Sequence, residues 1–309
     1  MTCEFQFLLC AYYKEKELKE AMPQQKNFVT MPAQHQNKQP GIESLMNPLP
    51  QFEDPNYKGS EKLKGKNVLI TGGDSGIGRA VSIAFAKEGA NIAIAYLDEE
   101  GDANETKQYV EKEGVKCVLL PGDLSDEQHC KDVVQETVQQ LGSLQVLVNN
   151  VAQQYPQQGL EYITAEQLEK TFRINIFSYF HVAKAALSHL KQGDVIINTA
   201  SIVAYEGNET LIDYSATKGA IVAFTRSLSQ SLVQKGIRVN GVAPGPIWTP
   251  LIPSSFDEKK VSQFGSNVPM QRPGQPYELA PAYVYLASSD SSYVSGQMIH
   301  VNGGVIVNG

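Results

Sequence analysis

Short apolar runs alternate with amphipathic stretches from about residue 66 to the end of the chain. Each run has the length of a buried strand, and the stretches between the runs repeat hydrophobic residues with the 3.6-residue period of a helix. Nearly continuous apolar strands that alternate with helices predict a parallel sheet covered on both faces. We therefore expect a doubly wound α/β fold with a mostly parallel, seven-stranded sheet. The expected strands are 67–71, 91–96, 115–120, 144–150, 194–199, 237–242 and 297–301.

The expected helices lie between these strands, and several have recognisable ends. Ser125 and Thr164 are each followed three residues later by glutamine, the pattern of a capping box at a helix N-terminus. Pro281 lies inside an otherwise helical stretch, and we expect a kink or interruption there because proline has no backbone N–H group. The expected helices are 79–89, 98–113, 125–141, 164–191, 214–234 and 277–288.

Residues 1–62 differ in composition from the rest of the chain. They are rich in Gln, Asn, Lys and Pro, and segments of this kind bury little apolar surface. We expect an N-terminal extension that is extended or partly disordered, followed by a single domain over residues 63–309. Leu45, Met46, Leu49 and Phe52 are apolar exceptions in the extension. The sequence leaves open whether it is a loose tail or an arm that packs on the body or on a second subunit.

Composition and charge narrow the class of protein. The 309 residues are 42% hydrophobic and 19% charged, as in ordinary soluble globular proteins. The net charge of −7 argues against nucleic acid or an anionic membrane as a partner. No apolar run reaches the length of about 18 residues that a membrane span needs. The four cysteines form no CxxC pair and the five histidines show no metal-ligand spacing. We therefore expect reduced thiols, a cytoplasmic protein and no metal site.

A glycine-rich turn, Thr71-Gly-Gly-Asp-Ser-Gly-Ile-Gly78, joins the first expected strand to the first expected helix. Gly72 allows a tight turn, Gly76 lets the backbone approach a pyrophosphate, and Gly78 lets the helix pack close to the sheet. Free amides and the helix dipole favour an anion at such an N-terminus. The turn therefore predicts a dinucleotide site. Its expected cofactor contacts are Gly72, Asp74, Ser75, Gly76, Ile77 and Gly78.

The choice between the two nicotinamide dinucleotides rests on residues near the end of the second expected strand. Tyr96 ends that strand, and Asp98 follows where an acid could bind the ribose hydroxyls of NAD(H). Ser75 stands where arginine or lysine would suit the 2′-phosphate of NADP(H). The absent base favours NAD(H), whereas the absent acid at Tyr96 weakens that preference and leaves NADP(H) possible. Asp98 is explained equally well as a helix N-cap. The next two strand ends offer the further candidate contacts Asp123, Leu124, Asn150 and Ala152.

Tyr214 and Lys218 are the strongest candidates for chemistry. Residues i and i+4 share a face of a helix, about 6 Å apart along its axis, so the lysine charge can act on the tyrosine hydroxyl. Lowering the phenol pKa by about three units needs roughly 4 kcal/mol, and one close cation in a shielded site could supply much of this. Tyr214 could then act as acid in carbonyl reduction and as base in alcohol oxidation. Ser201, just after the fifth expected strand, could bind the substrate oxygen.

Six motifs follow one another in a characteristic order. They are Thr71-Gly72-x3-Gly76-Ile-Gly78, Asn149-Asn150, Asn175, Ser201, Tyr214-x3-Lys218 and Pro244-Gly245. In combination they resemble the short-chain dehydrogenase/reductase family, and the resemblance covers residues 62–309. It implies a Rossmann-type fold and an NAD(P)-dependent oxidoreductase that acts on an alcohol or carbonyl group. One departure is that the fourth-strand motif usually ends in Ala-Gly, whereas this chain has Val151-Ala152.

The resemblance also implies roles for single residues. Tyr214 would be the catalytic acid/base, Ser201 would orient the carbonyl, and Lys218 would lower the tyrosine pKa and bind the nicotinamide ribose. Asn175 would hold a proton-relay water. Members of the family assemble as a dimer of dimers, so we expect a homotetramer. After the sixth strand, the family pattern implies cofactor contacts from Pro244, Gly245, Ile247 and Thr249.

With its N-terminal extension, the chain is similar to a subgroup labelled glucose/ribitol-type dehydrogenase homologues. Residues 248–268 are expected to form a mobile lid over the substrate, with a short helix at 257–264. A non-catalytic dinucleotide redox sensor and an enoyl (C=C) reductase are the alternatives. The intact set of tyrosine, lysine, serine and asparagine argues against a sensor. Enoyl reductases usually place the tyrosine and lysine farther apart than Tyr214 and Lys218.

Overall fold

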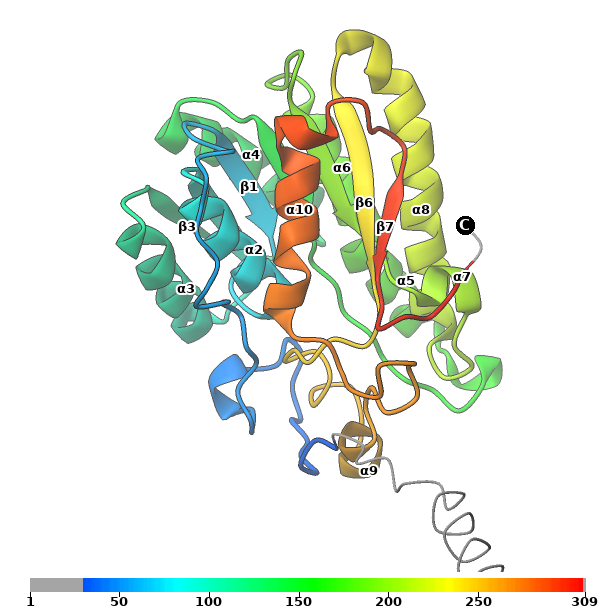
Figure 1. Ribbon diagram of the computed structural model, residues 1–309. Coiled ribbons are helices and arrows are strands. Elements are labelled where there is room, and N and C mark those ends of the chain that lie inside the picture. Colours follow the sequence, from blue (N-terminus) through cyan, green and yellow to red (C-terminus); the bar gives the residue numbers. More distant parts are fainter. Residues whose placement is uncertain (1–29, 308–309) are drawn as a thin grey trace, which may run out of the picture.

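The computed structural model describes residues 30–307. Cys3, Cys10 and the rest of the expected extension before residue 30 lie outside the described residues. The described strands form one parallel sheet in the order β3-β2-β1-β4-β5-β6-β7 (Figure 1). The strand order reverses between β1 and β4, which confirms the doubly wound fold. The strands are β1 (Asn67–Thr71), β2 (Asn91–Tyr96), β3 (Cys117–Pro121), β4 (Val146–Asn149), β5 (Val195–Thr199), β6 (Arg238–Pro244) and β7 (Met298–Val301).

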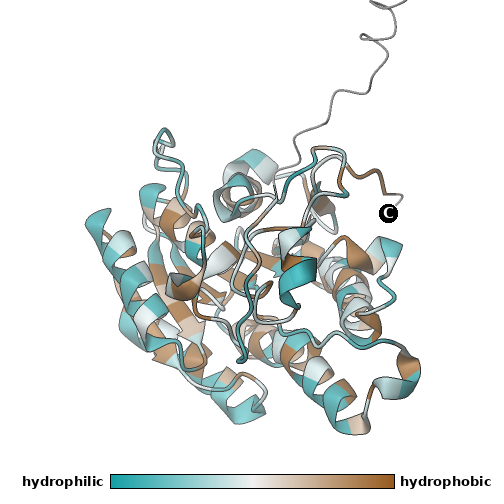
Figure 2. Ribbon diagram, turned by 90° about the horizontal axis from the view of Figure 1, so that it is seen from below, coloured by the Kyte–Doolittle hydropathy of each residue, from teal (hydrophilic) through white to brown (hydrophobic). Residues whose placement is uncertain are grey.

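Helices cover both faces of the sheet. One apolar cluster joins one face to α2, α3 and α10, and a second joins the other face to α4, α6 and α8. Figure 2 shows the helices with hydrophilic residues outward and hydrophobic residues toward the sheet. The α-helices are α2 (Gly76–Lys87), α3 (Glu100–Lys112), α4 (Glu127–Leu141), α5 (Ala165–Phe172), α6 (Ser178–Ala186), α7 (Val203–Glu206), α8 (Ile212–Leu232), α9 (Glu258–Ser262) and α10 (Ala280–Ala287).

The long helix expected over 164–191 is divided in the structure. Thr164 caps α5 as predicted, because its hydroxyl accepts from the backbone N–H of Gln167 at 3.1 Å. A π-helix at Arg173–Phe177 then separates α5 from α6. Such π-turns add a residue to the hydrogen-bonded ring and occur often at functional sites. The last helical segment also ends earlier than predicted, at Ala186.

Of two other helix predictions, one is wrong in detail and one is confirmed. The N-cap of α4 is Asp126 and not Ser125, because the Asp126 carboxylate accepts from the backbone N–H groups of Gln128 and His129. Pro281 lies in the first turn of α10, where a missing N–H group breaks no intrahelical hydrogen bond. The stretch expected over 277–288 is interrupted just before the proline, as predicted: a 3-10 helix at Pro276–Glu278 ends, and α10 begins at Ala280.

Residues 30–62, which we call the N-terminal arm, run along one edge of the domain beside the loop that carries α9 (Figure 1, blue). Met31 and Met46 of the arm are buried in an apolar cluster with Trp248 and Phe256. Phe52 packs against the core cluster on one face of the sheet, whereas Leu45 and Leu49 are exposed, so packing explains only part of the apolar pattern of the arm.

Several classes of feature are missing from residues 30–307. In that range no helix is long and apolar enough to cross a membrane. Nor do those residues contain three clustered side chains able to ligate a metal ion.

Cys117 and Cys130 are both free thiols and are buried in the core. Burial raises the pKa of each thiol to about 12.

Candidate active site

The glycine turn between β1 and α2 is closely packed. Gly72 and Gly76 have φ of +62° and +51°, in the left-handed region that favours glycine. A Cβ at Gly78 would lie 1.8 Å from the carbonyl oxygen of Gly72, so only glycine lets α2 begin this close to the strand. The turn and the first amides of α2 form one end of a cavity of about 700 Å³.

The end of β4 is tied to this turn by side-chain hydrogen bonds. The Asn150 amide donates to the carbonyl of Gly72 at 2.9 Å, and the Thr71 hydroxyl accepts from the backbone N–H of Asn150 at 2.9 Å. Asn150 and Ala152 line the cavity. The fourth strand therefore supports the glycine turn and contributes to the same wall.

The end of β2 presents a different acid from the one expected. Asp98 points to Lys38 of the arm at 2.6 Å, is half-exposed, and lies outside the cavity wall. The neighbouring Glu99 lines the cavity instead, and burial is the main cause that raises its pKa to about 8. Tyr96 donates to Glu100 at 2.5 Å. Asp98 is not the helix N-cap either, since that position belongs to Glu99.

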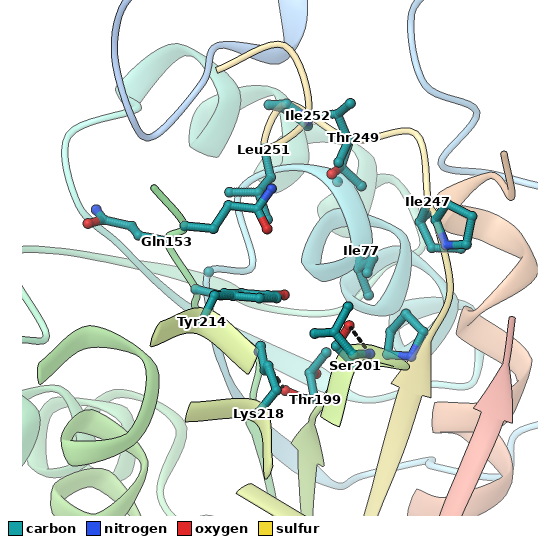
Figure 3. Close-up of a pocket in the computed structure, with 18 of the residues that line it drawn as sticks. Ile77, Gln153, Thr199, Ser201, Tyr214, Lys218, Ile247, Thr249, Leu251 and Ile252 are labelled. Atoms are coloured by element: carbon teal, nitrogen blue, oxygen red, sulfur yellow. Dashed lines mark hydrogen bonds between the residues drawn. The ribbon is translucent and has the colours of Figure 1, made fainter. Parts of the chain in front are cut away.

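Tyr214 and Lys218 lie one turn apart near the start of α8, and both side chains are buried. The Lys218 ammonium donates to the carbonyl oxygen of Thr199 at 2.9 Å and lies 5.4 Å from the centre of the Tyr214 ring. Ser201 follows β5 on the same side. Figure 3 shows these side chains around one cavity, with Leu251 of the loop after β6 facing Tyr214.

Burial dominates the acid–base properties of this pair. It raises the pKa of Tyr214 well above the usual range of a phenol, and a hydrogen bond with Ser201 offsets only part of this effect. It lowers the pKa of Lys218 from 10.5 to about 7. The expectation that the lysine charge makes the phenol acidic is therefore wrong for the folded chain. The reason is that desolvation penalises both charged forms. Tyr214 is a protonated phenol at neutral pH.

Asn175 lies in the π-helix and is fully buried. Its side-chain oxygen accepts from the backbone N–H of Gln153 at 2.8 Å, and its side-chain nitrogen donates to the carbonyl of Gln153 at 2.8 Å. The same nitrogen donates to Thr217 at 3.2 Å. Asn175 does not line the cavity, whereas Gln153 does. Its side chain thus holds a wall residue in place.

The structure gathers most of the predicted site residues around one cavity. Three of them, Gly78, Asp98 and Asn175, lie outside its wall. The arm residues Pro40 and Gly41 line it without having been predicted, because nothing in their local sequence marks them. The predicted residues in the wall are Gly72, Asp74, Ser75, Gly76, Ile77, Tyr96, Asp123, Leu124, Asn150, Ala152, Ser201, Tyr214, Lys218, Pro244, Gly245, Ile247 and Thr249. Their roles in catalysis and cofactor binding stay predictions.

Several known proteins with similar sequences are named as dehydrogenases or reductases. A family model described as Enoyl-(Acyl carrier protein) reductase matches residues 72–306. A protein of Daucus carota named glucose and ribitol dehydrogenase is 57% identical over 284 residues, which cover 90% of this chain and 98% of the relative. A protein of Arabidopsis thaliana named NADPH-dependent aldehyde reductase 1, chloroplastic, is 54% identical over 282 residues, covering 89% and 98%.

Solved structures agree with these sequence matches. The crystal structure of a short chain dehydrogenase from Burkholderia cenocepacia J2315 in complex with NADP superposes with a TM-score of 0.74. It is 27% identical in sequence, and the alignment covers 79% of this chain and 98% of that one. The matching family model and relatives, on the fold and cavity described above, show that this chain is an oxidoreductase of the short-chain dehydrogenase/reductase family.

Proposed function

We propose that the protein transfers a hydride between NADP(H) and an aldehyde or other carbonyl compound, with Tyr214 as the proton donor. The observation that carries this proposal is the burial of Tyr214 and Lys218 beside the cavity that the glycine turn also lines. A buried phenol next to a cofactor-sized cavity suits an enzyme that moves a proton and a hydride together.

The wall residues fit a nicotinamide dinucleotide. The turn from Gly72 to Ile77 lines the cavity at a helix N-terminus, and its backbone amides suit phosphate, except that of Gly76, which donates to Glu43. Thr249 of the loop after β6 lies beside this turn, because a Cβ on Gly76 would come within 3.1 Å of it, and Ile247 of the same loop also lines the cavity. When bound, the cofactor supplies or accepts the hydride. These residues would hold and orient it.

Tyr214 holds its proton at Oη because burial raises its pKa. It can therefore donate to a carbonyl oxygen as negative charge develops there. Ser201 would stabilise the same oxygen with its hydroxyl group. We infer that Lys218, with a pKa near 7 and 5.4 Å from the centre of the Tyr214 ring, helps to return a proton to Tyr214 after the reaction.

We infer that NADP(H) is the preferred cofactor, although the sequence favoured NAD(H). The Burkholderia structure is described as a complex with NADP, and the Arabidopsis relative is named NADPH-dependent. The end of β2 is compatible with this choice. The acid that lines the cavity there is Glu99, and its raised pKa leaves it mostly uncharged at neutral pH, so it would repel a 2′-phosphate only weakly.

Oxidation of NADPH and NADH, followed by absorbance with a panel of aldehydes, ketones and enoyl thioesters, tests the proposal. We expect turnover of carbonyl compounds with NADPH. Turnover of only the enoyl thioesters would favour an enoyl reductase, the activity named in the description of the family model. Binding of NADPH without turnover of any compound would favour the redox sensor. Undiminished activity of Tyr214→Phe would refute the role of the phenol.

The assembly and the cellular location are further parts of the proposal. We infer a homotetramer and a cytoplasmic enzyme from the family pattern. Exposed Phe177 and Phe180 support an assembly, because they leave apolar surface uncovered near α8. Light scattering at several protein concentrations would test the tetramer, and a monomer at all of them would contradict it.

A further inference from the structure

The N-terminal arm contacts three walls of the cavity. Pro40 and Gly41 line the cavity themselves. Neighbouring arm residues bind the glycine turn, the loop after β4 and the loop after β6. Figure 1 shows the arm close to the loop that carries α9. The reaction proposed above does not account for these contacts.

Glu43 holds the glycine turn. One carboxylate oxygen accepts from the backbone N–H of Gly76 at 2.6 Å, and the other lies 2.8 Å from the guanidinium of Arg79. Glu43 is 2% exposed and Arg79 is 1% exposed. The Gly76 amide belongs to the first turn of α2, where N–H groups have no partner inside the helix. The arm therefore supplies the acceptor that fixes the start of α2.

Gln39 holds the opposite wall. Its side-chain oxygen accepts from the backbone N–H of Gln154 at 3.2 Å, and its side-chain nitrogen donates to the carbonyl of Gln154 at 2.6 Å. Gln154 lines the cavity. Between these two anchors, a Cβ on Gly41 would come within 2.4 Å of the carbonyl oxygen of Pro250. The arm therefore lies directly against the loop after β6.

Further bonds join the arm to this loop. The backbone N–H of Gln36 donates to the carbonyl of Pro253 at 2.8 Å, and the indole of Trp248 donates to the carbonyl of Pro48 at 2.9 Å. Trp248 is fully buried and belongs to the apolar cluster that contains Tyr214. The arm is thus connected to the proposed proton donor through one layer of packed side chains.

We propose that Glu43 and Gln39 are positioning residues, which set the cofactor end and the substrate end of the cavity, respectively. Pro40 and Gly41 then close the cavity between them, so the arm admits only carbonyl compounds small enough to fit beneath it. This inference rests on the proposed function. It extends the active site to a segment that the glycine turn and the Tyr214–Lys218 pair do not predict.

Two substitutions at Glu43 test the cofactor end. Glu43→Ala removes the acceptor for Gly76, and we expect the KM for NADPH to rise about tenfold or more with little change in kcat. Glu43→Gln keeps an acceptor oxygen and should recover most of the affinity. Glu53→Gln is the matched control, because Glu53 of the same arm pairs with Lys87 at the far end of α2.

Gln39→Ala tests the substrate end. We expect it to change the KM for the carbonyl compound and to raise the relative activity on bulky over small aldehydes, while the KM for NADPH stays that of wild type. The exposed Gln51 of the arm gives the control variant Gln51→Ala. Unfolding midpoints of all variants would show whether a lost activity is a loss of fold.

The outcomes separate this inference from the proposed function. Quenching of the fluorescence of Trp248, the only tryptophan, measures NADPH binding without turnover. If Glu43→Ala and Gln39→Ala had the KM values of an active wild-type enzyme, the role of the arm would be overturned and the proposed function would stand. Parallel losses in both variants, with no difference between cofactor and substrate, would also overturn it. A wild-type protein that neither binds nor oxidises NADPH would overturn both proposals.

Discussion

Replacing Lys218 by methionine should stabilise the folded protein at neutral pH. The Lys218 side chain is 1% exposed, and burial lowers its pKa from 10.5 to about 7. That fall corresponds to a cost of roughly 4 to 5 kcal/mol for carrying the charge inside the protein. Methionine has a similar length and carries no charge, so Lys218→Met removes this cost.

The substitution also removes one hydrogen bond. Lys218 donates to the carbonyl oxygen of Thr199, and a hydrogen bond from a charged group stabilises by roughly 1.5 to 3 kcal/mol. The carbonyl keeps another donor, because the Tyr179 hydroxyl also bonds to it at 3.2 Å. The loss is therefore smaller than the charge penalty. We expect Lys218→Met to be more stable than wild type by about 2 kcal/mol at pH 7.

The difference in stability should shrink at higher pH. Between about pH 7 and 10.5 the unfolded chain holds a proton on Lys218 that the folded chain has released, so the stability of wild type rises with pH. Near pH 10 the amine is neutral in the folded protein and still donates to Thr199. The unfolded chain still holds most of this proton at pH 10, which leaves a cost of about 0.8 kcal/mol in wild type. This cost nearly cancels the roughly 1 kcal/mol of one neutral hydrogen bond, so the two proteins should be about equally stable.

Urea unfolding followed by circular dichroism at pH 7, 8.5 and 10 would measure both effects. Lys58→Met, at an exposed loop position, is the control and should show no such dependence. All proteins should be compared at one concentration, because an assembly would add to the apparent stability. A variant that is less stable than wild type at pH 7, or a difference that is the same at all three pH values, would refute the reasoning.

Three further substitutions test other parts of the site. Tyr214→Phe removes the proton donor and should lower kcat by about a hundredfold or more in the NADPH assay, with no loss of secondary structure. Gly78→Ala places a Cβ 1.8 Å from the Gly72 oxygen, so it should lower both the unfolding midpoint and the affinity for NADPH. The control Gly101→Ala should change neither, because a Cβ there would have no neighbouring atom within 4 Å. Glu99 has a pKa of about 8, so it should become charged above that pH. The charge would repel the 2′-phosphate of NADPH, so the KM should rise for NADPH but not for NADH, and Glu99→Gln should abolish this pH dependence.

The sheet could be predicted from the sequence because its strands are buried on both faces. Such strands read as uninterrupted apolar runs, and the limits of β1 and β2 agree with the predicted runs 67–71 and 91–96. The ends of helices were harder to predict, because a single capping side chain determines where a helix begins. Asp126 competes with Ser125 for the N-cap of α4, and its carboxylate reaches two backbone N–H groups. Both residues are common caps, so the pattern alone could not choose between them.

The arm could not be predicted from its composition. Whether Met46 is buried depends on Trp248, about two hundred residues later, and not on the polar residues beside it. The same holds for Glu43. A glutamate in a polar segment is usually solvated, but here it finds Gly76 and Arg79 across the fold. Contacts between segments that are far apart in the sequence produce no hydrophobic periodicity and no local motif, so they can be recognised only in the folded structure.

The acid–base behaviour of Tyr214 shows the same limit at the centre of the site. The spacing of Tyr214 and Lys218 correctly placed the two groups on one face of a helix, with the ammonium 5.4 Å from the centre of the tyrosine ring. Spacing says nothing about solvent, however, and the packing of Thr199 and Tyr179 over Lys218 leaves neither group hydrated. Desolvation then outweighs attraction and keeps the phenol protonated. The fold thus favours the proton-donating form of Tyr214, the form that reduction of a carbonyl group requires.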